Sequence, residues 1–173
     1  MNQARKRFYW TGIIAVAFAL GSLQKTNLTT AKDAVKQQTP ADAVAVVTDK
    51  SGVIFVSNDQ VSKAYAKGAL LYDGNPDRNY RVNVFHRDKP GEVEVHTKDT
   101  DIFYILEGSA TLATGGTMVG GKETAPGEVR GPSMTGGEVR HVTKGDVIII
   151  PANVAHCFTA VEQPTTYFGV KVR

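Results

Sequence analysis

Short runs in which apolar and polar residues alternate dominate the sequence after residue 43. In residues 80–86, Val82 and Val84 fall on one face of an extended strand, whereas Asn83 and Phe85 fall on the other. Similar runs predict further strands at 44–47, 53–56, 92–96, 102–106, 110–113, 138–142, 147–150, 157–160 and 166–172. Many short strands separated by turns predict an all-β barrel or jelly roll.

One segment has the pattern of a helix. Ser57 and Gln60 have the spacing of a capping box, and Val61 and the residues one turn later share an apolar face. Gly68 is a typical residue to end a helix. We therefore expect one short helix over residues 58–67, before most of the strands.

Residues 114–137 contain eight glycines and few large apolar side chains. This composition predicts a long loop without a core of its own. A loop of this length in a compact domain is either mobile or functional, for example as a lid over the mouth of a barrel.

The N-terminal segment, residues 1–21, has a different composition. Arg5, Lys6 and Arg7 precede an apolar run at 8–20, and small residues follow that run. This is the pattern of a secretory signal peptide, and the run is shorter than a typical membrane span. We expect a cleaved signal and a periplasmic or secreted protein. The alternative is an uncleaved membrane anchor, with residues 8–20 as the tether.

The polar residues 22–43, in which Pro40 interrupts any helix, are expected to form a tether. The main domain is then 44–173. Hydrophobic residues make up 42% of the chain, which is enough for a core of this size.

The net charge of +3 comes from the first segment. Without Arg5, Lys6 and Arg7, 17 basic residues balance 17 acidic ones, so the main domain has no excess of positive charge for nucleic acid. A single cysteine, Cys157, excludes an intrachain disulfide. We expect it to be a buried, apolar residue that points away from His156.

The residues best suited to chemistry lie at 94–101 and at 156. Glu94 and His96 are two apart, so both point to the same face of a strand, and Asp101 follows on the next strand. A closed barrel can bring His156 to the same place. Two imidazoles and one or two carboxylates are ligands for a divalent ion such as Fe, Mn, Zn or Ni. The alternative for each is an ordinary surface or core side chain.

The spacing of these residues resembles that of the cupin family. In the first cupin motif, Glu94 stands at the first histidine position and His96 at the second. After four intervening residues Asp101 replaces the usual glutamate, and after six more comes Gly108.

The second cupin motif begins at Gly145 and continues through Pro151 to His156. Asn153 stands at the glycine position of the motif, and Ala160 stands at its final asparagine position. The resemblance covers residues 80–173. It implies a small double-stranded β-helix, the cupin form of the jelly-roll barrel.

The resemblance also implies that His96 and His156 are metal ligands. Glu94 in place of histidine and the shorter Asp101 would give a two-histidine site with one or two carboxylates, which favours Mn or Fe over Zn or Ni. Side chains expected to wall the pocket are Phe103, Ile105 and Phe158.

Three functions remain open from the sequence. The first is a metalloenzyme with dioxygenase, isomerase or lyase chemistry on a small polar molecule. The second is a binding module for a sugar-like ligand, in which the two substitutions mark a lost metal. The third is a structural protein that pairs with a second copy through Ile102, Tyr104 and Leu106 on the outer face of a strand.

Overall fold

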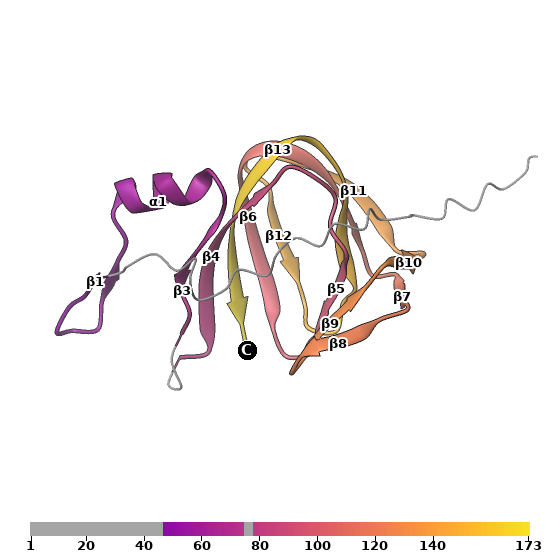
Figure 1. The fold of residues 1–173 in the computed structure, drawn as a ribbon, viewed down its shortest axis with the longest axis horizontal. Helices are drawn as coiled ribbons and strands as arrows, with labels where there is room; N and C mark the ends of the chain where they lie inside the picture. The colour runs from indigo at the N-terminus through magenta and orange to yellow at the C-terminus, as the bar shows by residue number, and fades with distance from the viewer. Residues whose placement is uncertain (1–46, 75–77) are drawn as a thin grey trace, which may run out of the picture.

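The computed structural model describes residues 47–74 and 78–173. In this part of the chain nine strands form one curled antiparallel sheet, with the order β11-β6-β13-β5-β9-β8, and with β12 beside β6, β4 beside β13 and β3 beside β4 (Figure 1). This is the predicted all-β fold class, with one short helix. The strands of the N-terminal half are β1 (Val47–Thr48), β2 (Ile54–Phe55), β3 (Ala69–Tyr72), β4 (Tyr80–Arg87), β5 (Val93–His96) and β6 (Thr100–Thr114). The remaining strands are β7 (Thr117–Val119), β8 (Lys122–Ala125), β9 (Glu128–Gly131), β10 (Ser133–Thr135), β11 (Glu138–Thr143), β12 (Val147–Ile150) and β13 (His156–Val172).

Two long strands, β6 and β13, run antiparallel and arch together over the barrel (Figure 1). The sequence pattern predicted each of them as two shorter strands. β6 is continuous because Gly108 adopts a positive φ of 82° inside it, which lets the strand bend without ending. The pairing shifts register at several points near this bend, as expected for bulges in a strongly curved sheet.

The core lies inside the curve of the sheet. Side chains at alternate positions point inward, so Phe103 and Ile105 are buried while Tyr104 between them is 46% exposed. The largest apolar cluster consists of Phe103, Ile105, Ala110, Leu112, Val142, Ile150, Phe158 and Tyr167. Buried apolar area of this kind is the main source of the barrel's stability.

The prediction of a loop over residues 114–137 is wrong. Four short strands lie in this segment: β7 pairs with β10, and β8 pairs with β9, which in turn pairs with β5. Met134 is buried, with Met118 packed against its cluster, so the segment contributes to a small core. Glycines serve here as turn residues with positive φ and as narrow positions, as at Gly131 beside Met118, rather than as flexible chain.

The predicted helix is present as α1 (Asn58–Tyr65) and begins at the expected capping box. The Ser57 side chain accepts from the backbone N–H of Gln60, and the Gln60 side chain accepts from the backbone N–H of Ser57. The hairpin predicted before the helix is also present, as the pair β1 and β2. Strand β3 was not predicted.

The expected signal or anchor at 1–21 and the tether at 22–43 lie outside the described residues. Within the described part of the chain, no helix is long and apolar enough to cross a membrane.

Candidate metal centre

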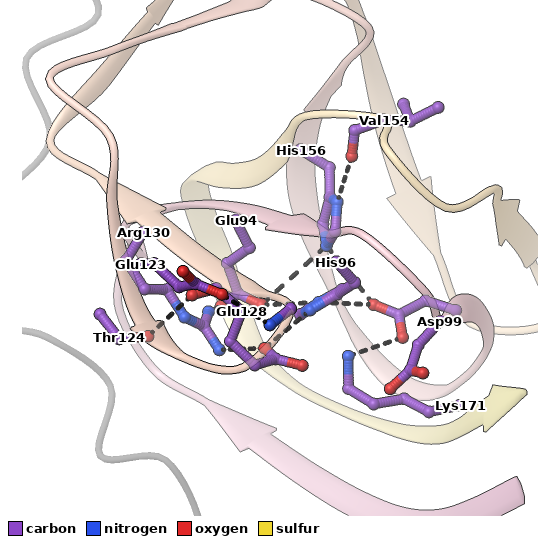
Figure 2. A network of polar contacts seen from close by, with 12 residues as sticks. Glu94, His96, Asp99, Glu123, Thr124, Glu128, Arg130, Val154, His156 and Lys171 are labelled. Atoms are coloured by element: carbon purple, nitrogen blue, oxygen red, sulfur yellow. Dashed lines mark hydrogen bonds and ion pairs between the residues drawn. The ribbon is translucent and has the colours of Figure 1, made fainter. Parts of the chain in front are cut away.

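The four predicted ligands lie together: Glu94, His96 and His156 face one another (Figure 2), and Asp101 lies 3.2–3.5 Å from the two imidazole Nε2 atoms. Strand β5 carries Glu94 and His96, β6 carries Asp101 near its start, and β13 carries His156 as its first residue. Glu94 and His156 are direct partners in the β5–β13 pair. His96, Asp101 and His156 are each at least 95% buried, whereas the Glu94 side chain is 22% exposed. The fold thus brings two distant sequence motifs to one point.

The distances between the donor atoms are similar to those between neighbouring ligand atoms around one metal ion. His96 Nε2 lies 3.2 Å from Asp101 Oδ2 and 3.4 Å from Glu94 Oε2. His156 Nε2 lies 3.5 Å from the same Asp101 oxygen and 4.0 Å from the same Glu94 oxygen. Around a metal with bonds of about 2.1 Å, neighbouring ligand atoms are roughly 3.0–3.4 Å apart. Glu94, His96 and His156 form a group that can hold a metal ion after small side-chain movements.

The two imidazoles have their Nε2 atoms free for such an ion. His156 Nδ1 is 3.0 Å from the carbonyl oxygen of Val154, and since a carbonyl only accepts, Nδ1 carries the hydrogen. The Nε2 atoms of His96 and His156 are both buried without a hydrogen-bond partner in the described residues. Buried polar atoms without partners are costly, so the donor set fits a bound cation.

On its other side, His96 faces Glu128. The Nδ1 atom lies 2.8 Å from Glu128 Oε2, although the two groups are not aligned as a hydrogen bond. A carboxylate in this position fixes the orientation of a metal-binding imidazole and increases its basicity.

Charges around the centre keep the Asp101 carboxylate ionised. Burial by itself would raise the pKa of Asp101, but the nearby His156 and His96 imidazoles and the charge of Lys171 hold that pKa far below its ordinary value. Burial by itself would lower the pKa of His96, but the carboxylates of Asp101 and Glu128 beside the ring outweigh burial and raise that pKa. Asp101 is therefore ionised at neutral pH.

Sequence reasoning missed three residues of the site: Glu128, Arg130 and Lys171. Register in the β5–β9 pair sets Glu128 opposite His96 and Arg130 opposite Glu94. Arg130 forms ion pairs with Glu94 and with Glu128, the latter at 3.5 Å, and Lys171 Nζ lies 2.8 Å from Asp101 Oδ1. The polar alternation of Glu128 and Arg130 around Val129 was the available signal for a strand here.

A cavity of about 110 Å³ adjoins the centre, with Glu94, Asp101 and Phe103 in its wall. The other two predicted wall residues, Ile105 and Phe158, belong to the core behind it and do not line it. Phe158 is covered because the guanidinium of Arg87 lies over its ring, 4.8 Å from the ring centroid. The cavity is lined instead by Lys67, Arg81, Asn83, Phe85, His86, Arg87, Glu94, Asp101, Phe103, Glu128, Arg130, Tyr167 and Lys171.

The other two histidines do not join the donor set. His86 lines the cavity and contacts Thr166 Oγ1 at 3.2 Å, and the His141 side chain is 55% exposed on β11.

Comparison with solved structures gives similar folds at low sequence identity. The protein BH2720 from Bacillus halodurans is 18% identical, with 73% of this chain and 86% of that chain covered and a TM-score of 0.49. A protein with a double-stranded beta-helix domain from Klebsiella pneumoniae is 19% identical over 61% of this chain and 76% of its own, with a TM-score of 0.42. The cupin protein BF4112 from Bacteroides fragilis is 16% identical over 61% and 75%, with a TM-score of 0.44.

No curated protein matches the chain. The family model described as Cupin matches residues 82–172, which is more than half of the sequence and contains all four residues of the candidate centre. The chain therefore belongs to the cupin family.

Proposed function

We propose that this protein is an exported metal-dependent cupin that acts on a small polar molecule in the cavity beside Glu94 and Asp101. One observation carries the proposal: two buried imidazole Nε2 atoms without hydrogen-bond partners in the described residues form a group with Glu94 that can hold an ion, and both atoms face the Asp101 carboxylate. The ligands would be His96 and His156 with Glu94 and Asp101. Nitrogen and carboxylate donors of this kind favour Mn or Fe and also accept Zn or Ni.

A divalent ion bound there would polarise an oxygen atom of the substrate or activate a small bound molecule. The residues of the chain have separate tasks around it. Asp101 stays ionised and holds both imidazoles in place, with Lys171 balancing its charge. Phe103 provides an apolar surface for the substrate. Dioxygenase, isomerase and lyase reactions all fit this arrangement of groups.

Metal analysis tests the proposal. Protein purified without a nickel column is expected to contain about one divalent ion per chain by mass spectrometry, since the site has one common point. The variants His96→Ala and His156→Ala are expected to lose it, and His141→Ala, an exposed histidine outside the site, to retain it. A metal content that is the same in all four proteins, or zero in the native one after incubation with Mn²⁺, Fe²⁺ and Zn²⁺, would exclude this function.

A binding module without metal is the second candidate, and one observation favours it. Arg130 already pairs with Glu94, and Lys171 with Asp101, so protein cations supply part of the charge that a metal would supply. In that case a sugar-like ligand raises the melting temperature of the protein, and added metal ions do not.

Export and self-association are part of the proposal. The cationic and apolar start of the chain supports export, and mass spectrometry of the N-terminus of protein from the periplasm or medium tests it.

For a homodimer, the support is the outer face of β6 and β12, where Tyr104, Val147 and Ile149 are 46–63% exposed. In light scattering, the variant Ile149→Asp is expected to have a lower mass in solution than the native protein.

A further inference from the structure

Arg87 is a buried cation without an acidic partner among the described residues. It is the last residue of β4, is 7% exposed and lines the cavity. Its Nη2 atom reaches the hydroxyl of Tyr167 at 3.5 Å, the limit of a hydrogen bond, while Nε and Nη1 have no hydrogen-bond partner in the described part of the chain. A guanidinium is always protonated, so this charge is removed from water without an acidic partner in the described residues.

The other cations of the cavity wall differ in this respect. Arg81 Nε lies 2.9 Å from Asp73, Arg130 pairs with Glu94 and Glu128, and Lys171 pairs with Asp101. Lys67 is exposed to solvent. Within the described ranges, Arg87 is thus the buried cation of this wall that forms no ion pair with an acidic side chain.

The surroundings of Arg87 hold its guanidinium in place. On one side the ring of Phe158 lies 4.8 Å from Cζ, a cation–π distance. On the other side is Gly91, where a Cβ would lie against the Nη1 atom, so the absence of a side chain makes room for the group. A positioned guanidinium with two free donors is the usual partner of a planar oxyanion.

We propose that Arg87 binds the carboxylate group of the substrate, and that the cavity therefore takes a small organic carboxylate. The wall has five basic residues, Lys67, Arg81, Arg87, Arg130 and Lys171, against three acidic ones, Glu94, Asp101 and Glu128. A volume of about 110 Å³ restricts the ligand to a few carbon atoms. Since Arg87 lines the same cavity as Glu94 and Asp101, two of the candidate metal ligands, a carboxylate at Arg87 lies in the cavity that adjoins the metal centre. The inference rests on the proposed function only for the role of this cavity as the substrate site.

A titration with propionate tests the inference, with uncharged propionamide and inorganic phosphate as comparison ligands. Dissociation constants come from amide shifts in ¹H–¹⁵N spectra of the native protein, Arg87→Met and Arg140→Met. Methionine keeps the contact with Phe158 without the charge, and Arg140 is an exposed arginine on β11 outside the cavity. We expect propionate to bind the native protein and Arg140→Met equally, and to bind Arg87→Met roughly 10- to 100-fold more weakly.

Equal binding of propionate to Arg87→Met and native protein would overturn the inference. So would equal binding of propionate and propionamide, tighter binding of phosphate than of propionate, or no binding of propionate to native protein. The native protein provides a second reading that does not depend on the folding of a variant. The Nε–H signal of Arg87 should shift with propionate, and an unchanged signal at saturation contradicts the proposal.

Each titration is done on chelator-treated protein and on protein loaded with diamagnetic Zn²⁺, which leaves the amide signals visible. Dependence on Arg87 in both states supports the inference whether or not a metal is bound. Failure of metal loading would instead count against the proposed metal function alone, so the two failures are distinguishable.

Discussion

Single residues at the centre are held from more than one side. His96 shows this most clearly, because Asp101 and Glu94 face its Nε2 atom while Glu128 faces its Nδ1 atom. Such an imidazole has little freedom to rotate away from a bound ion. The contribution of Glu128 is to orientation, since it lies on the side of the ring opposite to the proposed metal.

Replacement of Glu128 by Gln is expected to weaken metal binding by roughly 10- to 100-fold, because the amide no longer fixes the ring or increases its basicity. Competition with a chelator of known affinity measures the effect. Glu138→Gln, which changes an exposed glutamate on β11, is the matched control and should bind as the native protein does. Equal affinities for both variants would show that Glu128 does not position His96.

Cys157 confirms the prediction of a buried thiol. It is 3% exposed and packs with Val93, Ala113 and Met134 on the face of β13 opposite to His156. Burial raises the pKa of this thiol from 9.0 to about 11, against the opposing charge of Arg87.

Iodoacetamide is therefore expected to alkylate the native protein far more slowly at pH 9 than the protein in urea, because the thiolate is the reactive form. The free energy of unfolding should also fall as the pH rises from 9 to 11, since the unfolded chain loses the thiol proton first. Mass spectrometry measures the first effect and urea titration the second. Rapid labelling of native protein at pH 9 would contradict the burial of this thiol.

The sequence predicts those residues of the centre that occupy motif positions, but not those that strand register brings there. Glu94, His96, Asp101 and His156 were predicted because they occupy positions of two recognisable motifs, and the structure places them together. Their role as ligands stays a prediction. Glu128 was missed, because its position follows from the register between β5 and a strand in a glycine-rich segment where no long apolar alternation indicates pairing.

Among the elements, β6 shows how one glycine sets the shape of the barrel. Gly108 has a φ of 82°, and a Cβ there would meet the backbone of Pro164 and Thr165 on β13, with Thr165 Cα at 2.7 Å. Both the backbone angle and the space require glycine. The bend it allows explains why the pattern predicted two strands where the structure has one.

Gly108→Ala is expected to destabilise the protein by about 3 kcal/mol, from backbone strain and from the clash with β13 together. Gly115→Ala is the matched control, because its φ is 78° and nothing lies within 4 Å of the added Cβ. It should cost about 1 kcal/mol, from strain alone. Urea unfolding compares the free energies of unfolding of the two variants. Equal losses would mean that β6 and β13 can move apart at this contact at little cost in free energy.

For the whole molecule, the proposed ligands connect strands that are far apart in the sequence. Glu94 and His96 come from β5, Asp101 from β6 and His156 from β13. A metal at their common point would connect these three strands. Because an unfolded chain cannot present this set of ligands, binding of the ion would stabilise the fold as a unit.

Mn²⁺ at about a hundredfold excess over its dissociation constant should therefore add about 2.7 kcal/mol and raise the melting temperature by about 5–10 °C. Differential scanning fluorimetry measures the shift. His156→Ala should show no shift, whereas His141→Ala should behave as the native protein. A shift that persists in His156→Ala would place the stabilising ion elsewhere.

At this scale the sequence predicted the fold class well and the detail less well. Alternation and turn residues were sufficient for an all-β barrel with one capped helix, because both depend on local chemistry. The four strands in the glycine-rich segment were not predicted, since they are short and are held by pairing with the rest of the molecule. β3 was missed for the same reason.

The central position of β13 has a consequence for how the protein is made. This strand pairs with β4, β5 and β6, so its partners have no complete sheet until the ribosome has synthesised it. Contacts between such distant parts of a chain close slowly. Until β13 has been synthesised, the barrel of the nascent polypeptide therefore stays open and its apolar side chains stay exposed. We expect chaperones to bind the polypeptide during that interval.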